Sequence, residues 1–202
     1  MNKIKIFKYF IVHKPFNVLS GFTSTDGKKS LKDFFDVPQN VYPVGRLDFD
    51  SEGLLLLTDD KYVTDFLLNP MHGHEREYWV QVEGVITKEA IQELKQGVMI
   101  NINGKMVQTK KCHAEILMKQ PEVEARNPPI RIRKNIPESW VKLILTEGKN
   151  RQVRKMTAKT GFPTLRLIRN RIEKLTIDQL KPGEMKMLSQ AELYNLLRIK
   201  KR

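Results

Sequence analysis

The chain has 202 residues, of which 40% are apolar and 29% charged, an ordinary composition for a globular protein with one core or two small lobes. Its formal net charge of +13 is unusual and favours a polyanionic partner, with nucleic acid first and an anionic membrane surface second. No run approaches the roughly 18 apolar residues of a membrane-spanning helix, and the N-terminus lacks the apolar segment of a signal peptide, so we expect a cytoplasmic protein with no membrane partner.

Apolar periodicity and turn-forming residues predict an alternation of strands and short helices along the chain. Strands are expected at residues 4–13, 17–22, 54–57, 75–83, 98–102, 106–118, 140–146 and 165–172. Helical segments, including their caps, are expected at residues 31–35, 58–68, 87–97, 150–160 and 189–199. Because the strands interleave irregularly with few helices and no repeat is present, the sequence predicts an α+β fold with a largely antiparallel sheet.

Residues 119–137 are the part of the chain with the least regular pattern, because four prolines interrupt it. The segment also carries Arg126, Arg131, Arg133 and Lys134. It is either an exposed basic loop that becomes ordered on RNA or a solvated charged connection, and the sequence favours neither interpretation.

The few cysteine and histidine residues argue against a disulfide or a metal site. Cys112 is the single cysteine, which excludes an internal disulfide and fits a reducing compartment. His72 and His74 lie in a loop, and together with Cys112 and His113 they show none of the spacings that are typical of metal ligands. We therefore expect no metal.

A polar loop stands directly before the apolar run at residues 54–57. It places a glycine turn, Arg46 and Asp48 ahead of a rigid strand, which is where binding and catalytic side chains tend to lie. Asp48 is the first candidate for a reacting group, whereas Asp50 and Glu52 fit turn or capping roles better. A turn-forming role is also open for Asp48, and a glycosidase-like carboxylate pair fits less well, because such pairs are usually far apart in sequence.

Four segments resemble, in order and in spacing, the signature of the RNA pseudouridine synthases, in the branch that modifies single uridines in ribosomal RNA. They are residues 14–20, 45–55, 76–82 and 145–156, and with their surroundings they cover about residues 10–172. The resemblance implies the fold of that family, a central, mostly antiparallel mixed sheet in two lobes with the active cleft between them. It makes residues 1–202 a single catalytic domain that ends in a basic tail at about 198–202.

The position of the first motif bears on the subgroup within that branch. Many relatives carry a small RNA-binding domain, the S4 domain, ahead of the catalytic one, yet here the first motif begins near residue 10. We therefore expect no N-terminal S4 domain. This places the chain near a subgroup that acts on large-subunit ribosomal RNA and consists of the catalytic domain alone.

The resemblance also implies the reaction and its main residues. The bond from uracil N1 to ribose C1′ breaks, the base turns, and its C5 joins C1′; nothing is oxidised or added, so no cofactor is expected. Asp48 would act as nucleophile or base, and Lys149 would be the basic partner that keeps it ionised, with Arg151 as the alternative. Tyr78 would pack against the target base, although a strand tyrosine also fits a core position.

Further residues are assigned to RNA binding and to the pocket. Arg46 is suited to stack in the space that a flipped base leaves and to hold phosphate. The other side chains expected to bind RNA are Arg131, Arg133, Lys134, Arg151, Arg154 and Lys155. Leu165 and Ile168 would form the apolar floor of the pocket. An ordinary core position explains these two apolar residues equally well.

Three functions are compatible with the charge of the chain. They are a pseudouridine synthase acting on large-subunit (23S) or another ribosomal RNA, a non-catalytic ribosomal RNA-binding or ribosome-assembly protein, and a DNA-binding regulator. The regulator would need a helix-turn-helix or zinc module, and the sequence contains neither. Asp48, together with Tyr78 and Lys149, favours the enzyme, because a binding protein has no need for an aspartate facing phosphates. We expect a monomer.

Overall fold

The computed structural model describes residues 6–130, 136–177 and 180–200, and the chain divides into two compact units. The first unit comprises residues 1–72 and 171–202, and the second comprises residues 73–170. Arg131, Arg133 and Lys134 lie outside the described residues, as do the last two residues of the expected basic tail. A single catalytic domain built from two lobes stays a prediction.

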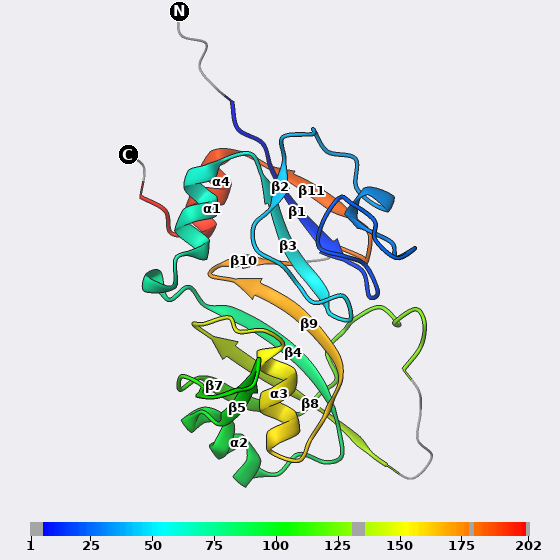
Figure 1. The fold of residues 1–202 in the computed structure, drawn as a ribbon, viewed down its shortest axis with the longest axis vertical. Coiled ribbons are helices and arrows are strands. Elements are labelled where there is room, and N and C mark those ends of the chain that lie inside the picture. Colours follow the sequence, from blue (N-terminus) through cyan, green and yellow to red (C-terminus); the bar gives the residue numbers. More distant parts are fainter. Residues whose placement is uncertain (1–5, 131–135, 178–179, 201–202) are drawn as a thin grey trace, which may run out of the picture. The chain divides into compact units, whose positions relative to one another are not determined.

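The first unit contains an antiparallel sheet in which β1 lies between β3 and β11 (Figure 1). β2 pairs with β3, and β10 pairs with the end of β9. Its elements are β1 (Tyr9–Lys14), η1 (Leu31–Asp33), β2 (Tyr42–Pro43), β3 (Glu52–Thr58), α1 (Lys61–Leu68), η2 (Pro70–His72), β10 (Leu175–Thr176), β11 (Met185–Leu188) and α4 (Gln190–Leu196).

β3 is the central strand of the first unit, and all seven of its residues are buried. Leu54 and Leu56 pack in a core with residues of α1 and α4. Leu55 and Leu57 face a second core that is covered by residues between 18 and 41. A strand covered on both faces has a continuous apolar sequence, which is why the pattern predicts this strand correctly.

The second unit contains a sheet with the strand order β9-β4-β8-β7 and a separate hairpin, β5-β6 (Figure 1). One face of β4 and β8 forms a core with apolar residues of both α2 and α3, so the two helices cover the same face. Its elements are β4 (Arg76–Glu83), α2 (Lys88–Gln96), β5 (Met99–Ile102), β6 (Lys105–Gln108), β7 (His113–Leu117), β8 (Glu138–Leu145), α3 (Gln152–Lys159) and most of β9 (Thr164–Ile172).

The ends of α2 follow the chemistry that its sequence predicts. The Thr87 side chain accepts a hydrogen bond from the Ala90 N–H at the start of the helix. At the end, Gly97 has a φ of +85°, and a Cβ at this position would collide with the backbone oxygen of Thr109. Glycine is therefore required both for the left-handed conformation and for the close approach of residues 109–110.

One strand prediction is wrong, and a second is wrong in part. Residues 17–22 form no strand, because Asn17 turns the chain with a φ of 56°, and Leu19 makes only an isolated bridge to Ser30. The single strand expected at residues 106–118 is two elements: β6 closes the hairpin with β5, and β7 joins the main sheet of the second unit beside β8.

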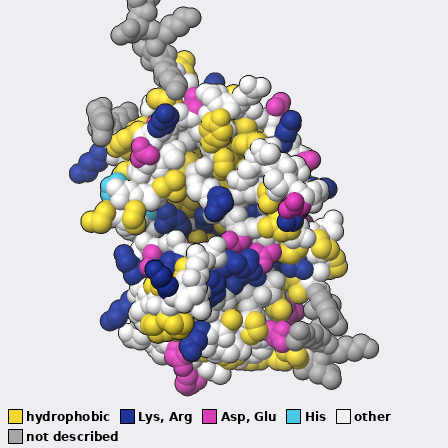
Figure 2. Space-filling model, viewed as in Figure 1, with side chains coloured by type: hydrophobic (Ala, Val, Ile, Leu, Met, Phe, Trp, Pro, Cys, Tyr) yellow, Lys and Arg dark blue, Asp and Glu magenta, His cyan; other side chains and the backbone are white. Residues whose placement is uncertain are grey.

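The architecture is the predicted α+β class, and the pairs β1–β11, β1–β3, β9–β10, β2–β3, β4–β8, β5–β6 and β7–β8 are antiparallel. Within the described ranges, no helix is both long and apolar enough to cross a membrane. Lys and Arg side chains are spread over the face shown in Figure 2, in agreement with the net charge of +13.

Candidate active site

The loop before β3 presents Arg46 and Asp48 to solvent while it buries the leucine between them. Gly45 turns the chain with a φ of +74°, and a Cβ there would lie 3.2 Å from Leu68 Cδ2. Arg46 is exposed and Asp48 is half-buried, whereas Leu47 is only 8% exposed. Leu47 is thus a buried position between an exposed arginine and a half-buried aspartate.

Backbone hydrogen bonds fix both ends of this loop. The Val44 N–H donates to the Leu56 carbonyl at 2.8 Å, which attaches the start of the loop to β3. The Ser51 N–H donates to the Asp48 carbonyl at 3.0 Å and closes a turn immediately before the strand. The predicted reacting group therefore lies in a braced turn and not in a free loop.

Tyr78 lies on β4, and its side chain packs against the core of the second unit with Val80 and Val82, as the strand alternation predicts. Tyr78 is half-buried, and its hydroxyl is hydrogen-bonded to Arg169 of β9. Burial lowers the pKa of the Arg169 guanidinium and the contact with Tyr78 opposes this effect, while nearby Arg76 lowers the pKa further. A buried cation therefore stands at the phenol, which the sequence analysis did not anticipate.

The opposite face of β4 is fixed to its neighbours by Glu77. Its Oε1 accepts hydrogen bonds from Asn170 Nδ2 at 3.0 Å and from Trp79 Nε1 at 3.2 Å. Because Asn170 belongs to β9, this carboxylate ties the strand that carries Tyr78 to the strand that carries Arg169. Both faces of the strand pair are thus held by polar contacts.

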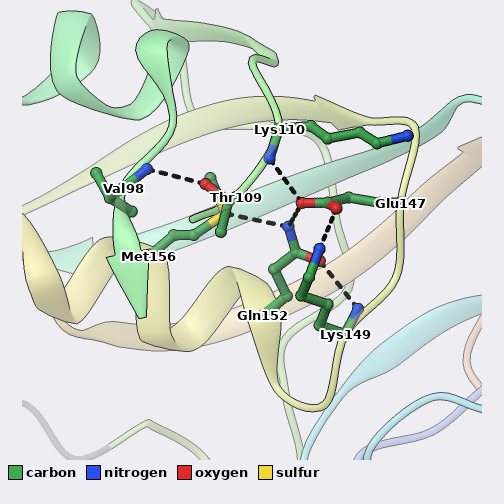
Figure 3. Close-up of polar contacts among 7 residues, drawn as sticks. All are labelled: Val98, Thr109, Lys110, Glu147, Lys149, Gln152 and Met156. Carbon is green, nitrogen blue, oxygen red and sulfur yellow. Dashed lines mark hydrogen bonds and ion pairs between the residues drawn. The ribbon is translucent and has the colours of Figure 1, made fainter. Parts of the chain in front are cut away.

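Lys149 lies in a network centred on Glu147, in the loop between β8 and α3 (Figure 3). Its ammonium is paired with the Glu147 carboxylate. Glu147 Oε1 also accepts from Gln152 Nε2 at 2.6 Å and from the Lys110 N–H at 2.9 Å. The Lys149 N–H donates to Gln152 Oε1 at 2.9 Å. The role of Lys149 as partner of Asp48 stays a prediction.

This network sets the protonation state of Glu147. Burial raises the pKa of Glu147, but the hydrogen bonds from Lys149, the Lys110 N–H and Gln152 outweigh it, so the pKa is lower than usual. Glu147 is therefore ionised and joins the motif at residues 145–156 to the backbone of Lys110. The sequence offers one signal for this, a glutamate two residues before a lysine in a glycine-containing turn.

The basic residues at the start of α3 differ in exposure. Arg151 is exposed and has a left-handed backbone conformation, with a φ of 52°, directly before the helix begins. Arg154 and Lys155 are half-buried. Val153 and Met156 face the core, as the helical spacing predicts. Contact of Arg151, Arg154 and Lys155 with RNA stays a prediction.

The predicted pocket residues lie on β9. Ile168 is 1% exposed and Leu165 is half-buried. The Leu165 carbonyl accepts a hydrogen bond from Arg126 Nη1 at 3.3 Å, and Arg126 also donates to the carbonyls of Pro128 and Pro129. The described part of the basic loop is therefore attached to β9 through Arg126. A pocket role for Ile168 and Leu165 stays a prediction.

In the part of the chain that the structure describes, no group of three or more His, Cys, Asp or Glu residues is arranged to hold a metal ion. Cys112 Sγ donates to the Leu94 carbonyl at 3.1 Å. Burial, with a smaller contribution from Glu147, raises the pKa of Cys112 to about 11, so the thiol is protonated. It is a structural cysteine in this environment.

Comparison with known proteins identifies the class to which this fold and these motifs belong. Residues 8–159 match the family described as RNA pseudouridylate synthase, and the chain belongs to this family. A solved crystal structure of pseudouridylate synthase superimposes with a TM-score of 0.77 and 28% identity, covering 97% of this chain and 76% of that chain. The fold is thus the pseudouridine synthase fold, as the motifs predict.

Individual members of this family are similar to the chain over most of its length. The chain is 44% identical over 182 residues to ribosomal large subunit pseudouridine synthase E of Vibrio vulnificus, covering 90% of this chain and 75% of that protein. It is 44% identical over 174 residues to the protein of the same name from Xanthomonas axonopodis pv. citri, with 85% and 89% covered. Dual-specificity RNA pseudouridine synthase RluF of Escherichia coli is 31% identical over 189 residues, with 93% and 57% covered.

Proposed function

We propose that this chain converts a uridine of large-subunit ribosomal RNA into pseudouridine, with Asp48 as the reacting carboxylate. The observation that carries the proposal is the 44% identity, over most of both chains, with relatives named for that substrate. The braced loop that holds Asp48 half-exposed beside Arg46 supports it from within this chain.

The reaction needs an ionised carboxylate. As a nucleophile, Asp48 attacks ribose C1′. A bond forms between C1′ and a carboxylate oxygen of Asp48, the bond from C1′ to uracil N1 breaks, and its electron pair stays on the uracil. The base then turns, C5 bonds to C1′ and releases the carboxylate, the C5 proton leaves, and N1 gains a proton. As a base, Asp48 instead removes a sugar proton as the C1′–N1 bond breaks, and the proton returns to the sugar when C5 bonds to C1′. No atom is gained or lost overall.

The remaining roles follow from position and charge. Tyr78 is proposed to pack against the detached uracil, with its hydroxyl oriented by Arg169. Lys149 is proposed as the basic partner of Asp48 and Arg151 as the alternative. Within the second unit the Lys149 ammonium is already paired with the Glu147 carboxylate.

RNA recognition is proposed to rest on the basic side chains. Arg46 is exposed two residues from Asp48, where a planar guanidinium can stack in the space left by the flipped uridine. Base flipping costs a few kcal/mol, which contacts of this kind offset.

The proposal is tested by tritium release from large-subunit ribosomal RNA that carries uridine labelled at C5. We expect release by the wild-type chain and none by Asp48→Asn, whose RNA affinity should stay within about threefold because the substitution removes no cation. Asp65→Asn, an exposed aspartate of α1, is the matched control and should release tritium normally.

The outcomes of this experiment distinguish the enzyme from the non-catalytic RNA-binding protein and test the role of Asp48. Normal turnover by Asp48→Asn would refute the assignment of Asp48. Binding of ribosomal RNA without release by the wild type would point instead to the non-catalytic RNA-binding protein.

A further inference from the structure

The hydroxyl of Ser20 holds the residue that directly precedes Asp48. Ser20 Oγ donates to the Leu47 carbonyl at 2.8 Å and accepts from the Leu47 N–H at 3.0 Å. One side chain therefore uses its donor and an acceptor on the two polar groups of a single residue, which fixes both the position and the orientation of that residue. Ser20 comes from the segment after β1, so the contact joins two parts of the first unit that are distant in sequence.

Three successive backbone carbonyls around Asp48 each accept a hydrogen bond from a different donor. The Leu47 carbonyl is held by Ser20, the Asp48 carbonyl by the Ser51 N–H at 3.0 Å, and the Phe49 carbonyl by Lys14 Nζ at 3.4 Å. Because peptide units are planar, fixing the units on both sides of a residue fixes its two backbone dihedrals. The direction in which the Asp48 side chain leaves the backbone is set in this way.

The segment that carries Ser20 is itself rigidly attached. The Leu19 N–H donates to the Lys29 carbonyl at 2.9 Å, and the Leu31 N–H donates to the Gly21 carbonyl at 2.8 Å. Lys14 is fully buried, and its ammonium donates to the Pro15 carbonyl at 2.9 Å and to the Val18 carbonyl at 2.7 Å. The hydroxyl that holds Leu47 is thus mounted on a braced turn, and a displacement of the Asp48 loop would break contacts on both sides.

We propose that Ser20 is a positioning residue for the reaction, because its hydroxyl fixes the backbone of the Asp48 loop so that the carboxylate meets the target ribose in the productive geometry. The inference rests on the proposed role of Asp48. Ser20 touches no reacting atom; it acts through Leu47. A displacement of about 1 Å at a reacting group can lower a rate roughly 100-fold, so the loss of this hydroxyl should appear in the chemical step.

The chain offers a matched control. Ser24 lies in the same polar segment, and its hydroxyl donates to the Lys28 carbonyl at 2.6 Å, but it makes no hydrogen bond to the Asp48 loop. Ser24→Ala therefore removes a serine hydroxyl and its one side chain-to-backbone hydrogen bond, which is exposed, without touching Leu47. Ser20→Thr keeps the hydroxyl, and Ser20→Ala removes it.

The experiment measures three quantities for each full-length variant: the single-turnover rate constant of tritium release at saturating enzyme, the RNA dissociation constant, and the thermal midpoint. For Ser20→Ala we expect the rate constant to fall about 10- to 100-fold, with RNA affinity within about twofold of wild type. Ser20→Thr should recover most of the rate, and Ser24→Ala should match the wild type.

Two results would overturn the inference alone, both with an active wild-type chain. One is an unchanged rate constant for Ser20→Ala. The other is a loss of rate in Ser20→Ala that weaker RNA binding or the fraction of unfolded protein explains fully. An equal loss of rate in Ser24→Ala would count in the same way. Absence of tritium release by the wild type would overturn the proposed function, and the positioning role with it.

Discussion

A single carboxylate, Glu147, holds together the loop that carries the basic residues of the motif at residues 145–156. It receives one charged and two neutral hydrogen bonds, from Lys149, Gln152 and the Lys110 backbone, and its side chain is only 11% exposed. An ionised group with this many donors is stabilised in the folded state relative to the unfolded chain. The structural role of Glu147 can therefore be separated from catalysis by measuring stability against pH.

Glu147→Gln should lower the free energy of unfolding at pH 7 by about 1 to 3 kcal/mol, because it removes the charge that Lys149 binds. The folded-state pKa of Glu147 lies below the usual value of 4.5, so its stabilising contribution is complete above that pH and is lost as the pH falls through the folded-state pKa. The difference between wild type and variant should thus shrink below about pH 4.5. Urea unfolding at several pH values measures it.

The control for this measurement is Glu93→Gln, a change at an exposed position of α2 in the same unit. It should change stability little at any pH. A Glu147→Gln difference of constant size from pH 7 down to pH 3 would show that the carboxylate charge does not stabilise the loop.

At the scale of elements, Asp60 joins one strand and two helices of the first unit. Its Oδ1 accepts from the Tyr62 N–H at 3.0 Å and caps α1, while Oδ2 accepts from the hydroxyls of Tyr9 in β1 at 2.7 Å and Tyr194 in α4 at 3.3 Å. Burial raises the pKa of the Tyr9 hydroxyl, which therefore stays protonated and donates. The three elements are held by one buried side chain.

Asp60→Ala should lower the free energy of unfolding by about 2 to 4 kcal/mol, since it removes a helix cap and leaves the buried Tyr9 hydroxyl without its acceptor. Chemical denaturation measures the change. Asp65→Ala, an exposed change on the same helix, should alter stability by less than about 0.5 kcal/mol. Equal effects of the two substitutions would mean that Asp60 contributes no more than a surface residue.

The elements that the sequence predicts well are those whose signals are local. α1 and α2 begin at capping residues, and β3 has an apolar run bounded by turns, so each is visible in a short window. The missed elements depend on distant partners: β11 forms only because its backbone pairs with β1. Residues 17–22 have the composition of a strand, but their backbone groups bind residues 29 and 31, and the Ser20 side chain binds the Asp48 loop.

In the candidate site, too, some residues can be predicted from local sequence signals and others cannot. Asp48 and Tyr78 can be selected from motif positions, and the face on which Tyr78 lies follows from strand alternation. The contacts of Ser20 with Leu47 and of Arg169 with Tyr78 could not be predicted from the sequence, whereas the spacing of Glu147 and Lys149 in a glycine-containing turn is only a weak signal for their ion pair. Each depends on how a turn or a neighbouring strand orients a side chain, and no spacing rule contains that information.

At the scale of the whole molecule, the net charge of +13 makes RNA binding dependent on salt. Each neutralised phosphate of a single strand contributes about 0.7 to the slope of log affinity against log salt. If all seven proposed RNA-binding side chains (Arg46, Arg131, Arg133, Lys134, Arg151, Arg154 and Lys155) contact phosphate, the slope is about −5, and affinity falls roughly 1,000-fold between 50 and 200 mM salt.

Filter-binding titrations of large-subunit ribosomal RNA at several salt concentrations measure this slope. Reversal of Arg131, Arg133 and Lys134 to glutamate should reduce its magnitude by about 2, because three phosphate contacts are lost, and should weaken binding most at low salt. The single-turnover rate of this triple variant at saturating enzyme should change little with salt, since no part in the chemical step is proposed for Arg131, Arg133 or Lys134. An unchanged slope would show that residues 131–134 form a solvated connection, and a wild-type slope near −1 would place recognition in uncharged contacts.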